Sequence, residues 1–503
     1  MRILMMTNTY APHVSGVARS VEAFAREYRR RGHHVLIVCP EFEKAPKHEP
    51  DVVRVPAIQR FNGSDFSLVL ITPRWLRAAV EAFAPEIIHS HHPFFLGATA
   101  VRLARLLELP LVFTHHTMYE HYTHYVPGDS GAMRRFAMHL STNYANLSDA
   151  VFAPCEAVAT ILRRRGVRVP LQVVPTGVSL EEFSGGSGSG FRAIMEIPED
   201  AFLVGHVGRL APEKNLGLLA RALARFLLAT PMAHALIVGA GPSRSKMHED
   251  LQRPELEGRV HFAGVLENRF LVSAYTAMDA FAFTSLSETQ GMVLLEAMAA
   301  SVPVVAVSGP GVDEVVRDRE NGRLLAQADE AGFAAALGEI ATLPVEERHA
   351  LSCRARQTAE ACSIVRTADT ALAAYGALLA HPRAPKVKAH EAWQRTLRLL
   401  RSEWDLLAGI ADAAVSHGEE EDLPPGGAHR ARHASACRSV LIASGHKTGR
   451  GEACDGGHNP RSKCGEAGGG RALSTLHSDL VRCDGHHRAL VPFDDRLSPA
   501  RWG

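Results

Sequence analysis

The sequence predicts an α/β protein built from two doubly wound, Rossmann-like halves that face each other across a cleft. Three observations lead to this prediction. Short apolar segments alternate with helical segments from the first residues, a Gly/Ser-rich stretch at 183–190 interrupts the alternation, and the alternation then starts again. Such alternation produces parallel sheets covered by helices. Ligands of these sheets bind beyond the carboxyl ends of the strands, so the cleft is the expected site.

The first half begins with a strand, a loop and a helix. Residues 3–6 are apolar, residues 7–16 form a polar loop, and apolar side chains then recur at helical spacing over 17–28. The arginines at 29–31 stand where the helix dipole favours positive charge, and Gly32 follows as a stop signal. Short apolar runs predict the later strands of this half at 35–38, 87–89, 111–113, 150–153 and 172–174.

The second half repeats this pattern. Apolar runs predict its strands at 202–205, 235–238, 260–262, 280–283 and 304–307. The tail is dominated by Gly, His, Arg, Pro and Ser, a composition that cannot build a core, so we expect it to be disordered. The predicted segments are an N-terminal Rossmann-like domain at 1–180, a hinge at 181–200, a C-terminal Rossmann-like domain at 201–380, a helical extension at 381–416 and the disordered tail at 417–503.

The composition excludes several classes of protein. The 503 residues are 46% hydrophobic and 22% charged, as in an ordinary soluble protein. Fifty-five Lys and Arg against 54 Asp and Glu give a formal net charge of +1, so a strongly basic nucleic-acid-binding chain is excluded. The first residues lack a secretory signal, and Glu296, Pro303 and Pro310 interrupt the apolar window 291–312. We therefore expect a cytoplasmic protein.

Two carboxylates eight residues apart, Glu288 and Glu296, give the strongest chemical signal. Glu288 lies in the loop after an expected strand, and Glu296 lies two turns into an apolar helix that starts near Gln290. The free backbone N–H groups of a helix start bind phosphate, and Gly291 would let a phosphate approach closely. The carboxylates would then bind hydroxyls of a sugar and a ribose. The alternative is an ordinary helix cap and an unrelated Glu.

A cationic loop favours the phosphate interpretation. Arg209 and Lys214 follow the strand at 202–205 within one short loop, and two cations at such a place suit a diphosphate. Taken alone, the loop is equally compatible with a solvated turn. The segment 238–242 has Arg244 where a GxGxxG motif needs its third glycine, and the chain contains no GxxxxGK[ST] motif. A dinucleotide dehydrogenase and a P-loop protein are therefore not expected.

A third segment, 113–125, collects histidines and tyrosines behind a strand of the first half. A His at a strand end that faces the cleft can orient a hydroxyl or take its proton. A zinc site is the alternative for so many histidines. However, the segment has no HExxH motif and no nearby Cys pair, and the chain's eight cysteines include no CxxC. The tyrosines are also compatible with core packing.

Together these segments resemble the retaining nucleotide-sugar glycosyltransferases of family four (group 1), which have the two-domain GT-B architecture. The resemblance runs from residue 1 to about residue 380, and it rests on the E-x7-E motif, the cationic loop and the segment 174–178. Within the family, the segments 89–97 and 116–122 are most similar to the bacterial diacylglycerol glucosyltransferases.

The resemblance implies roles for individual residues. Glu288 binds the sugar hydroxyls and Glu296 the ribose, while Arg209 and Lys214 hold the leaving diphosphate. His116 contacts the donor sugar and the acceptor hydroxyl, and forms the catalytic set with Glu288, Arg209 and Lys214. The remaining donor-binding positions are Gly16, Gly264, Val265, Gly291, Met292 and Val293. The N-terminal domain binds the acceptor, with Tyr119, Glu120 and Tyr122 on the acceptor side. Neither a metal nor a cofactor is expected, because the cations and the helix start stabilise the charge.

The predicted activity is transfer of a hexosyl group, as from UDP-glucose, to a hydroxyl with the anomeric configuration retained. Electrostatic stabilisation of the departing diphosphate would be the main catalytic effect. A diacylglycerol-type acceptor would make the protein peripheral on the inner membrane face, where the basic and apolar residues of 74–77 and 133–136 would meet anionic lipid. Solvated helix faces explain these two segments equally well.

Three other functions stay open on the sequence. A transferase with a soluble sugar or polysaccharide acceptor would use the same donor motifs. Paired carboxylates also serve glycosidases, although the cationic loop has no purpose in them. A non-catalytic nucleotide-sugar-binding protein is the third possibility, and the intact set of site residues argues against it.

Overall fold

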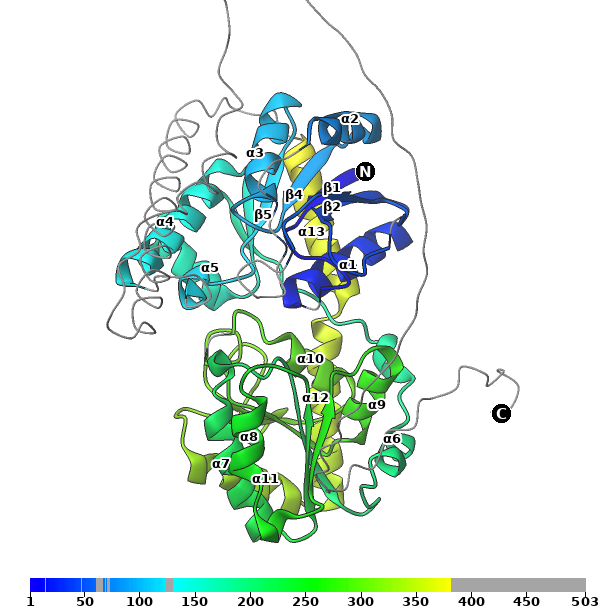
Figure 1. Ribbon diagram of the computed structural model, residues 1–503, viewed down its shortest axis with the longest axis vertical. Helices are drawn as coiled ribbons and strands as arrows, with labels where there is room; N and C mark the ends of the chain where they lie inside the picture. The colour runs from blue at the N-terminus through cyan, green and yellow to red at the C-terminus, as the bar shows by residue number, and fades with distance from the viewer. Residues whose placement is uncertain are drawn as a thin grey trace, which may run out of the picture. The chain divides into compact units, whose positions relative to one another are not determined.

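The computed structural model describes residues 1–13, 15–46, 48–59, 67, 69, 73–123, 130–286 and 288–380. The predicted helical extension and the predicted disordered tail therefore lie outside the described residues. The described part contains two parallel sheets, each with helices between its strands, which confirms the predicted fold class (Figure 1).

Seven strands form the sheet of the N-terminal half, in the order β3-β2-β1-β4-β5-β6-β7, and all neighbours are parallel. The strands are β1 (Arg2–Met6), β2 (His34–Pro40), β3 (Val52–Val55), β4 (Ile87–Ser90), β5 (Leu111–Thr114), β6 (Ala150–Ala153) and β7 (Leu171–Val173). The order reverses between β1 and β4. The carboxyl ends of these two strands therefore form the topological switch point, where ligands bind in such sheets.

Helices cover both faces of this sheet. They are α1 (Gly16–Arg30), α2 (Arg74–Phe83), α3 (Leu96–Leu106), α4 (Gly131–Leu147), α5 (Glu156–Arg164) and, from the far end of the described chain, α13 (Ile364–Ala380). Because strand side chains alternate, Leu4 and Met6 enter the core under α2 to α5, while Ile3 and Met5 enter the core under α1 and α13. Figure 1 shows α13 beside α1.

Six strands form the sheet of the C-terminal half, in the order β10-β9-β8-β11-β12-β13, again with parallel neighbours. The strands are β8 (Phe202–Val207), β9 (Ala233–Val238), β10 (Val260–Gly264), β11 (Ala280–Phe283), β12 (Val304–Val307) and β13 (Gly322–Leu325). The helices are α6 (Gly188–Ile194), α7 (Leu216–Ala229), α8 (Arg244–Leu251), α9 (Asn268–Ala277), α10 (Met292–Ala299), α11 (Glu330–Thr342) and α12 (Val345–Ala361). The switch point lies between β8 and β11.

Two edge strands, β3 and β13, are not predicted by the apolar pattern. Arg54 interrupts β3 and pairs with Glu49 at 2.6 Å, while Arg323 interrupts β13 and pairs with Asp318 at 2.8 Å. An edge strand has only one strand neighbour, so it tolerates a charged side chain that breaks an apolar run.

The chain crosses between the halves at two adjacent segments. The Val178 amide donates to the Cys362 carbonyl at 3.1 Å, and the Ile364 amide donates to the Val178 carbonyl at 3.0 Å. Gly177 is required here, because a Cβ on it would lie 2.2 Å from the Ile364 Cα. The predicted hinge, 181–200, contains the short helix α6, which contacts α9. Motion within it stays a prediction.

No helix in the described ranges has both the length and the apolar character needed to span a bilayer.

Candidate active site

The cationic loop of the C-terminal half follows β8 and contains a short 3-10 helix, Pro212–Lys214. The Lys214 ammonium donates to a carboxylate oxygen of Glu288, which follows β11, and both side chains are about four-fifths buried. Burial opposes the charge on Lys214, but the contact with Glu288 outweighs it and raises the pKa of Lys214, so the side chain stays protonated. The two predicted residues thus meet at the switch point of this sheet.

Arg209 belongs to the same loop and is exposed. Two glycines after β9 support the loop from behind. A Cβ on Gly239 would lie 1.9 Å from the Gly208 carbonyl oxygen, and a Cβ on Gly241 would lie 2.3 Å from the Leu210 carbonyl oxygen. The glycine-rich segment 238–242 therefore packs against the backbone of the cationic loop.

The helix α10 begins beside Glu288. Gly291 precedes it with a φ of +69°, the left-handed region that favours glycine, and Met292 and Val293 form its first turn. The first N–H groups of a helix have no partner within the helix and present partial positive charge. The residues predicted to cradle a phosphate are therefore brought to a helix start next to the Lys214–Glu288 pair.

Glu296 lies one turn further along α10 and is buried. Its Oε2 accepts a hydrogen bond from the Tyr275 hydroxyl at 2.7 Å, and its Oε1 accepts one from the Arg19 guanidinium at 2.7 Å. Glu296 in turn raises the pKa of Arg19. In this arrangement both carboxylate oxygens of Glu296 accept hydrogen bonds from protein side chains. The predicted contact of Glu296 with ribose stays a prediction. Arg19 lies in the first turn of α1, and no motif in the sequence marks it as a site residue.

In the N-terminal half, His116 follows β5 and contacts a histidine that follows β4. The Nε2 of His116 lies 2.9 Å from the Nδ1 of His91, and the two rings lie edge to edge with centroids 5.2 Å apart. Burial lowers the pKa of both imidazoles well below the usual range, so both are neutral at pH 7. The Thr289 hydroxyl donates to the His116 carbonyl at 2.7 Å and joins this edge to the loop that carries Glu288.

The sequence does not predict His91 as a site residue either. One signal was present, because both histidines follow neighbouring strands and the carboxyl ends of parallel strands meet at one edge. Which strands are neighbours, however, is a property of the sheet order.

The predicted acceptor-side residues lie largely inside the N-terminal half. The Tyr119 ring packs edge-on against Phe94 at 5.3 Å, and its hydroxyl is buried. Glu120 forms an ion pair with Arg165, which follows α5. Tyr122 lies near enough to Lys214 to help raise its pKa. Of the three, Tyr122 is thus the one brought toward the donor residues, and the acceptor contacts stay predictions.

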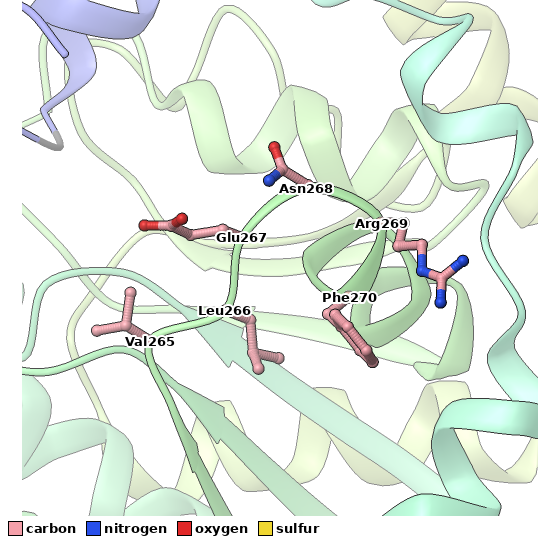
Figure 2. A pocket seen from close by; sticks show the side chains of 6 residues that line it. All are labelled: Val265, Leu266, Glu267, Asn268, Arg269 and Phe270. Atoms are coloured by element: carbon pink, nitrogen blue, oxygen red, sulfur yellow. The ribbon is translucent and has the colours of Figure 1, made fainter. Parts of the chain in front are cut away.

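Three donor-binding positions lie at or just beyond the ends of elements and border open space. A Cβ on Gly16 would meet no atom within 4 Å. Gly264 ends β10 with a φ of +70°, and Val265 after it is exposed at the rim of a depression of about 520 Å³ lined by residues 265–270. Figure 2 shows this loop, with Glu267 and Arg269 pointing to opposite sides. The predicted role of Gly264 and Val265 in donor binding stays a prediction.

The described residues contain no cluster that could bind the zinc ion considered as an alternative for the histidine-rich segment. Nowhere in these ranges do three side chains of His, Cys, Asp or Glu come together as a metal ion requires. The crowded histidines bind one another and their neighbours instead. His92, for example, accepts a hydrogen bond at Nδ1 from the backbone N–H of Asn8 at 3.0 Å.

The two segments proposed for membrane contact are partly buried. In α2, Leu76 enters the core, whereas Arg74, Trp75 and Arg77 are exposed. In α4, Phe136 packs against the core while both neighbouring arginines are exposed. A basic surface with one large exposed aromatic ring therefore exists on α2.

Comparison with known families matches both halves. Residues 14–182 match the family described as Glycosyltransferase Family 4, and residues 190–358 match Glycosyl transferases group 1.

Relatives and solved structures extend this similarity. An alpha-monoglucosyldiacylglycerol synthase of Streptococcus pneumoniae is 29% identical over 362 residues, covering 70% of this chain and 81% of that protein. A D-inositol 3-phosphate glycosyltransferase of Geodermatophilus obscurus is 30% identical over 335 residues, covering 64% and 72%. The crystal structure of Anabaena HepE in complex with UDP-glucose superposes with a TM-score of 0.59 at 21% identity, covering 75% of this chain and all of that chain.

Proposed function

We propose a reaction for this chain on the premise that it belongs to the family four (group 1) glycosyltransferases, because its first half matches the Family 4 model and its second half matches the group 1 model. The chain is a nucleotide-sugar-dependent hexosyltransferase. The proposed reaction is transfer of a glucosyl group from UDP-glucose to the free hydroxyl of a diacylglycerol-type lipid, with the anomeric configuration retained. The observation that carries the donor side is the buried Lys214–Glu288 pair beside the start of α10.

On the donor side, the chain supplies positive charge where the bond to the diphosphate breaks. Lys214 and Arg209 neutralise the leaving oxygens, and the N–H groups at the start of α10 point partial positive charge at the same place. Glu288 holds the Lys214 side chain in position. When the diphosphate replaces Glu288 as the ion-pair partner of Lys214, the Glu288 carboxylate becomes free to accept hydrogen bonds from the sugar hydroxyls.

On the acceptor side, the chain supplies neutral groups. A neutral imidazole has one donor and one acceptor nitrogen, so His116 can bind a sugar hydroxyl without adding charge. The Thr289–His116 hydrogen bond keeps this histidine next to the donor loop.

The lipid acceptor is supported by the pneumococcal relative, whose name specifies diacylglycerol, and by the exposed Arg74, Trp75 and Arg77 on α2. A second candidate is a soluble hydroxyl acceptor, which the name of the Geodermatophilus relative supports. Both candidates use the same donor site. They differ in whether the enzyme must reach a bilayer.

A vesicle experiment separates the two candidates. The purified chain is mixed with vesicles of dioleoylglycerol in anionic phosphatidylglycerol, and binding and UDP-glucose turnover are measured at rising salt. Each basic residue near such a surface contributes about 1 kcal/mol, so Arg74→Glu with Arg77→Glu should weaken binding at least about tenfold. Glucosylation of the vesicles should fall with binding, while hydrolysis of UDP-glucose should be unchanged.

The matched control reverses Arg221 and Arg225, two exposed arginines on α7 of the other half. Arg221 pairs with Glu330 as Arg77 pairs with Glu81, so each double variant breaks one surface ion pair. The control should bind vesicles normally. A chain that ignores anionic vesicles at low salt, yet glucosylates inositol phosphate, would have a soluble acceptor.

A further inference from the structure

The ring pair formed by His91 and His116 connects two neighbouring strands at their carboxyl ends. His91 is the first residue after β4, and His116 is the second residue after β5. Their facing nitrogens are 2.9 Å apart and their rings are inclined by 24°. At this distance one nitrogen carries a hydrogen and the other accepts it, so each ring fixes the orientation of the other.

His91 is held rigidly on its far side. Its ring packs on the His89 ring with centroids 4.2 Å apart. His89 itself is hydrogen-bonded through both nitrogens, to the Thr114 hydroxyl at 2.7 Å and to the Tyr375 hydroxyl at 2.6 Å. A fixed ring behind His91 keeps its Nδ1 directed at His116.

The other nitrogen of His91, Nε2, is buried and has no hydrogen-bond partner in the described part of the chain. The hydrogen bond to His116 is therefore the single polar contact that the described residues give this ring. Burying a polar side chain lowers the stability of the fold unless the side chain is hydrogen-bonded. An apolar Leu or Phe would fill this place at lower cost, so the imidazole of His91 indicates a role beyond packing.

A hydrogen bond at one nitrogen of a neutral imidazole determines the state of the other. If His91 donates to the Nε2 of His116, the Nδ1 of His116 carries a proton and donates to a substrate. If His91 accepts instead, that Nδ1 has a lone pair and accepts from a substrate. The tautomer of His116 thus decides what His116 can do at a hydroxyl.

We propose that His91 is a positioning residue that fixes both the ring orientation and the tautomer of His116. The inference rests on the proposed function in one respect, namely that His116 contacts the reacting sugar or acceptor hydroxyl. His91 itself touches no substrate, and it acts through its Nδ1 alone.

The restriction to Nδ1 allows a matched pair of variants. The amide of Asn lies where the Nδ1 of His lies, whereas the amide of Gln extends to the position of Nε2. His91→Asn should keep the contact with His116, and His91→Gln should lose it. In UDP-glucose transfer to dioleoylglycerol vesicles, His91→Gln should lower kcat about tenfold or more with an almost unchanged KM for UDP-glucose, and His91→Asn should recover most of that loss.

The same ring pair occurs a second time and provides a control. His234 on β9 and His261 on β10 meet edge to edge with their ring nitrogens 3.0 Å apart, in the C-terminal half and at the amino ends of the strands. His234→Gln breaks an equivalent pair away from His116, so kcat should stay at the wild-type value. A loss equal to that of His91→Gln would show that any broken ring pair impairs the fold, and would overturn the proposal.

Nitrogen NMR of the imidazoles tests the inference without activity. In wild-type protein labelled with 15N-histidine, His116 should show the shifts of one tautomer, and its signal is identified by its loss in His116→Gln. His91→Gln should convert this signal to a mixture of tautomers. A mixture in the wild type, or an unchanged tautomer in His91→Gln, overturns the role of His91. A single tautomer with no transfer to lipid leaves that role intact and refutes the proposed acceptor.

Discussion

The two halves of the molecule handle charge in opposite ways at corresponding places. At the switch point of the C-terminal sheet, Lys214 and Glu288 form a buried ion pair. At the switch point of the N-terminal sheet, β4 is followed by two neutral, buried imidazoles, of which His91 contacts His116 and His92 accepts from the backbone N–H of Asn8 after β1.

This difference follows the chemistry that each half would perform. A departing diphosphate needs strong positive charge, and a buried cation is tolerable only with a partner that it can exchange for the phosphate. A reacting hydroxyl needs oriented donors and acceptors with little net charge, and neutral imidazoles supply these. Four predictions test the contrast, in order of decreasing effect.

Acid should destabilise the N-terminal half more than the C-terminal half. Burial lowers the pKa of His89 and His92 to about 3 and that of His115 to about 4, from an ordinary value of 6.5. Below pH 6.5 these histidines therefore bind protons in the unfolded chain but not in the folded chain. The free energy of unfolding consequently falls as the pH falls from 6.5 toward 4. The loss is at most about 1.4 kcal/mol per pH unit for each such histidine.

Hydrogen exchange measured by mass spectrometry at pH 7 and pH 5.5, corrected for the intrinsic rate, checks this expectation. Peptides of β4 and β5 should lose more protection than peptides of β8 and β11, where His206 is the counterpart with a pKa lowered to about 4. Equal loss in both halves would contradict the contrast.

Removal of a cation from the C-terminal half should abolish most turnover. Lys214→Ala and Arg209→Ala should each lower kcat by roughly a hundredfold, or about 3 kcal/mol, because one charge-stabilising contact to the departing diphosphate is lost. Lys246→Ala, which removes a surface lysine paired with Asp250 on α8, is the control and should leave kcat unchanged. Near-normal rates in both site variants would refute the donor site.

The hydroxyl of Tyr375 should contribute to the stability of the N-terminal half. Tyr375→Phe leaves a buried nitrogen of His89 without its 2.6 Å partner, at a cost of about 1–3 kcal/mol. Tyr28→Phe removes only a 3.5 Å contact to the same hydroxyl and should cost clearly less. Urea unfolding of both variants measures the difference, and equal effects would mean that the His89 contact is not the important one.

Chelation should have the smallest effect, namely none. Because Arg209, Lys214 and the start of α10 supply the positive charge, turnover in EDTA should equal that in buffer alone. A steep loss of activity that a single added divalent metal restores would show that the C-terminal half needs a metal to stabilise its diphosphate.

The sequence predicted the parts of the fold and of the site that depend on local pattern. Apolar runs located the central strands, and the family resemblance assigned Lys214 and Glu288 to one donor site, although their contact depends on β8 and β11 being neighbours. Arg19 and His91 could not be found in this way. Arg19 contacts Glu296, 277 residues away, and no local pattern distinguishes it from the other arginines of α1. His91 contacts His116 only because β4 and β5 are neighbours, with Ser90 opposite Phe113.

The position of α13 sets the order in which the two halves can be completed during protein synthesis. Tyr375 follows Tyr28 by 347 residues. At about 5–20 residues per second, a ribosome needs roughly 17–70 s to travel that distance. Throughout that interval, the face of the N-terminal sheet that carries Ile3 and Met5 lacks α13, one of the two helices that cover it, and by the end of the interval every strand of the C-terminal sheet is already made. The half that is synthesised first is therefore the last to be able to close its core.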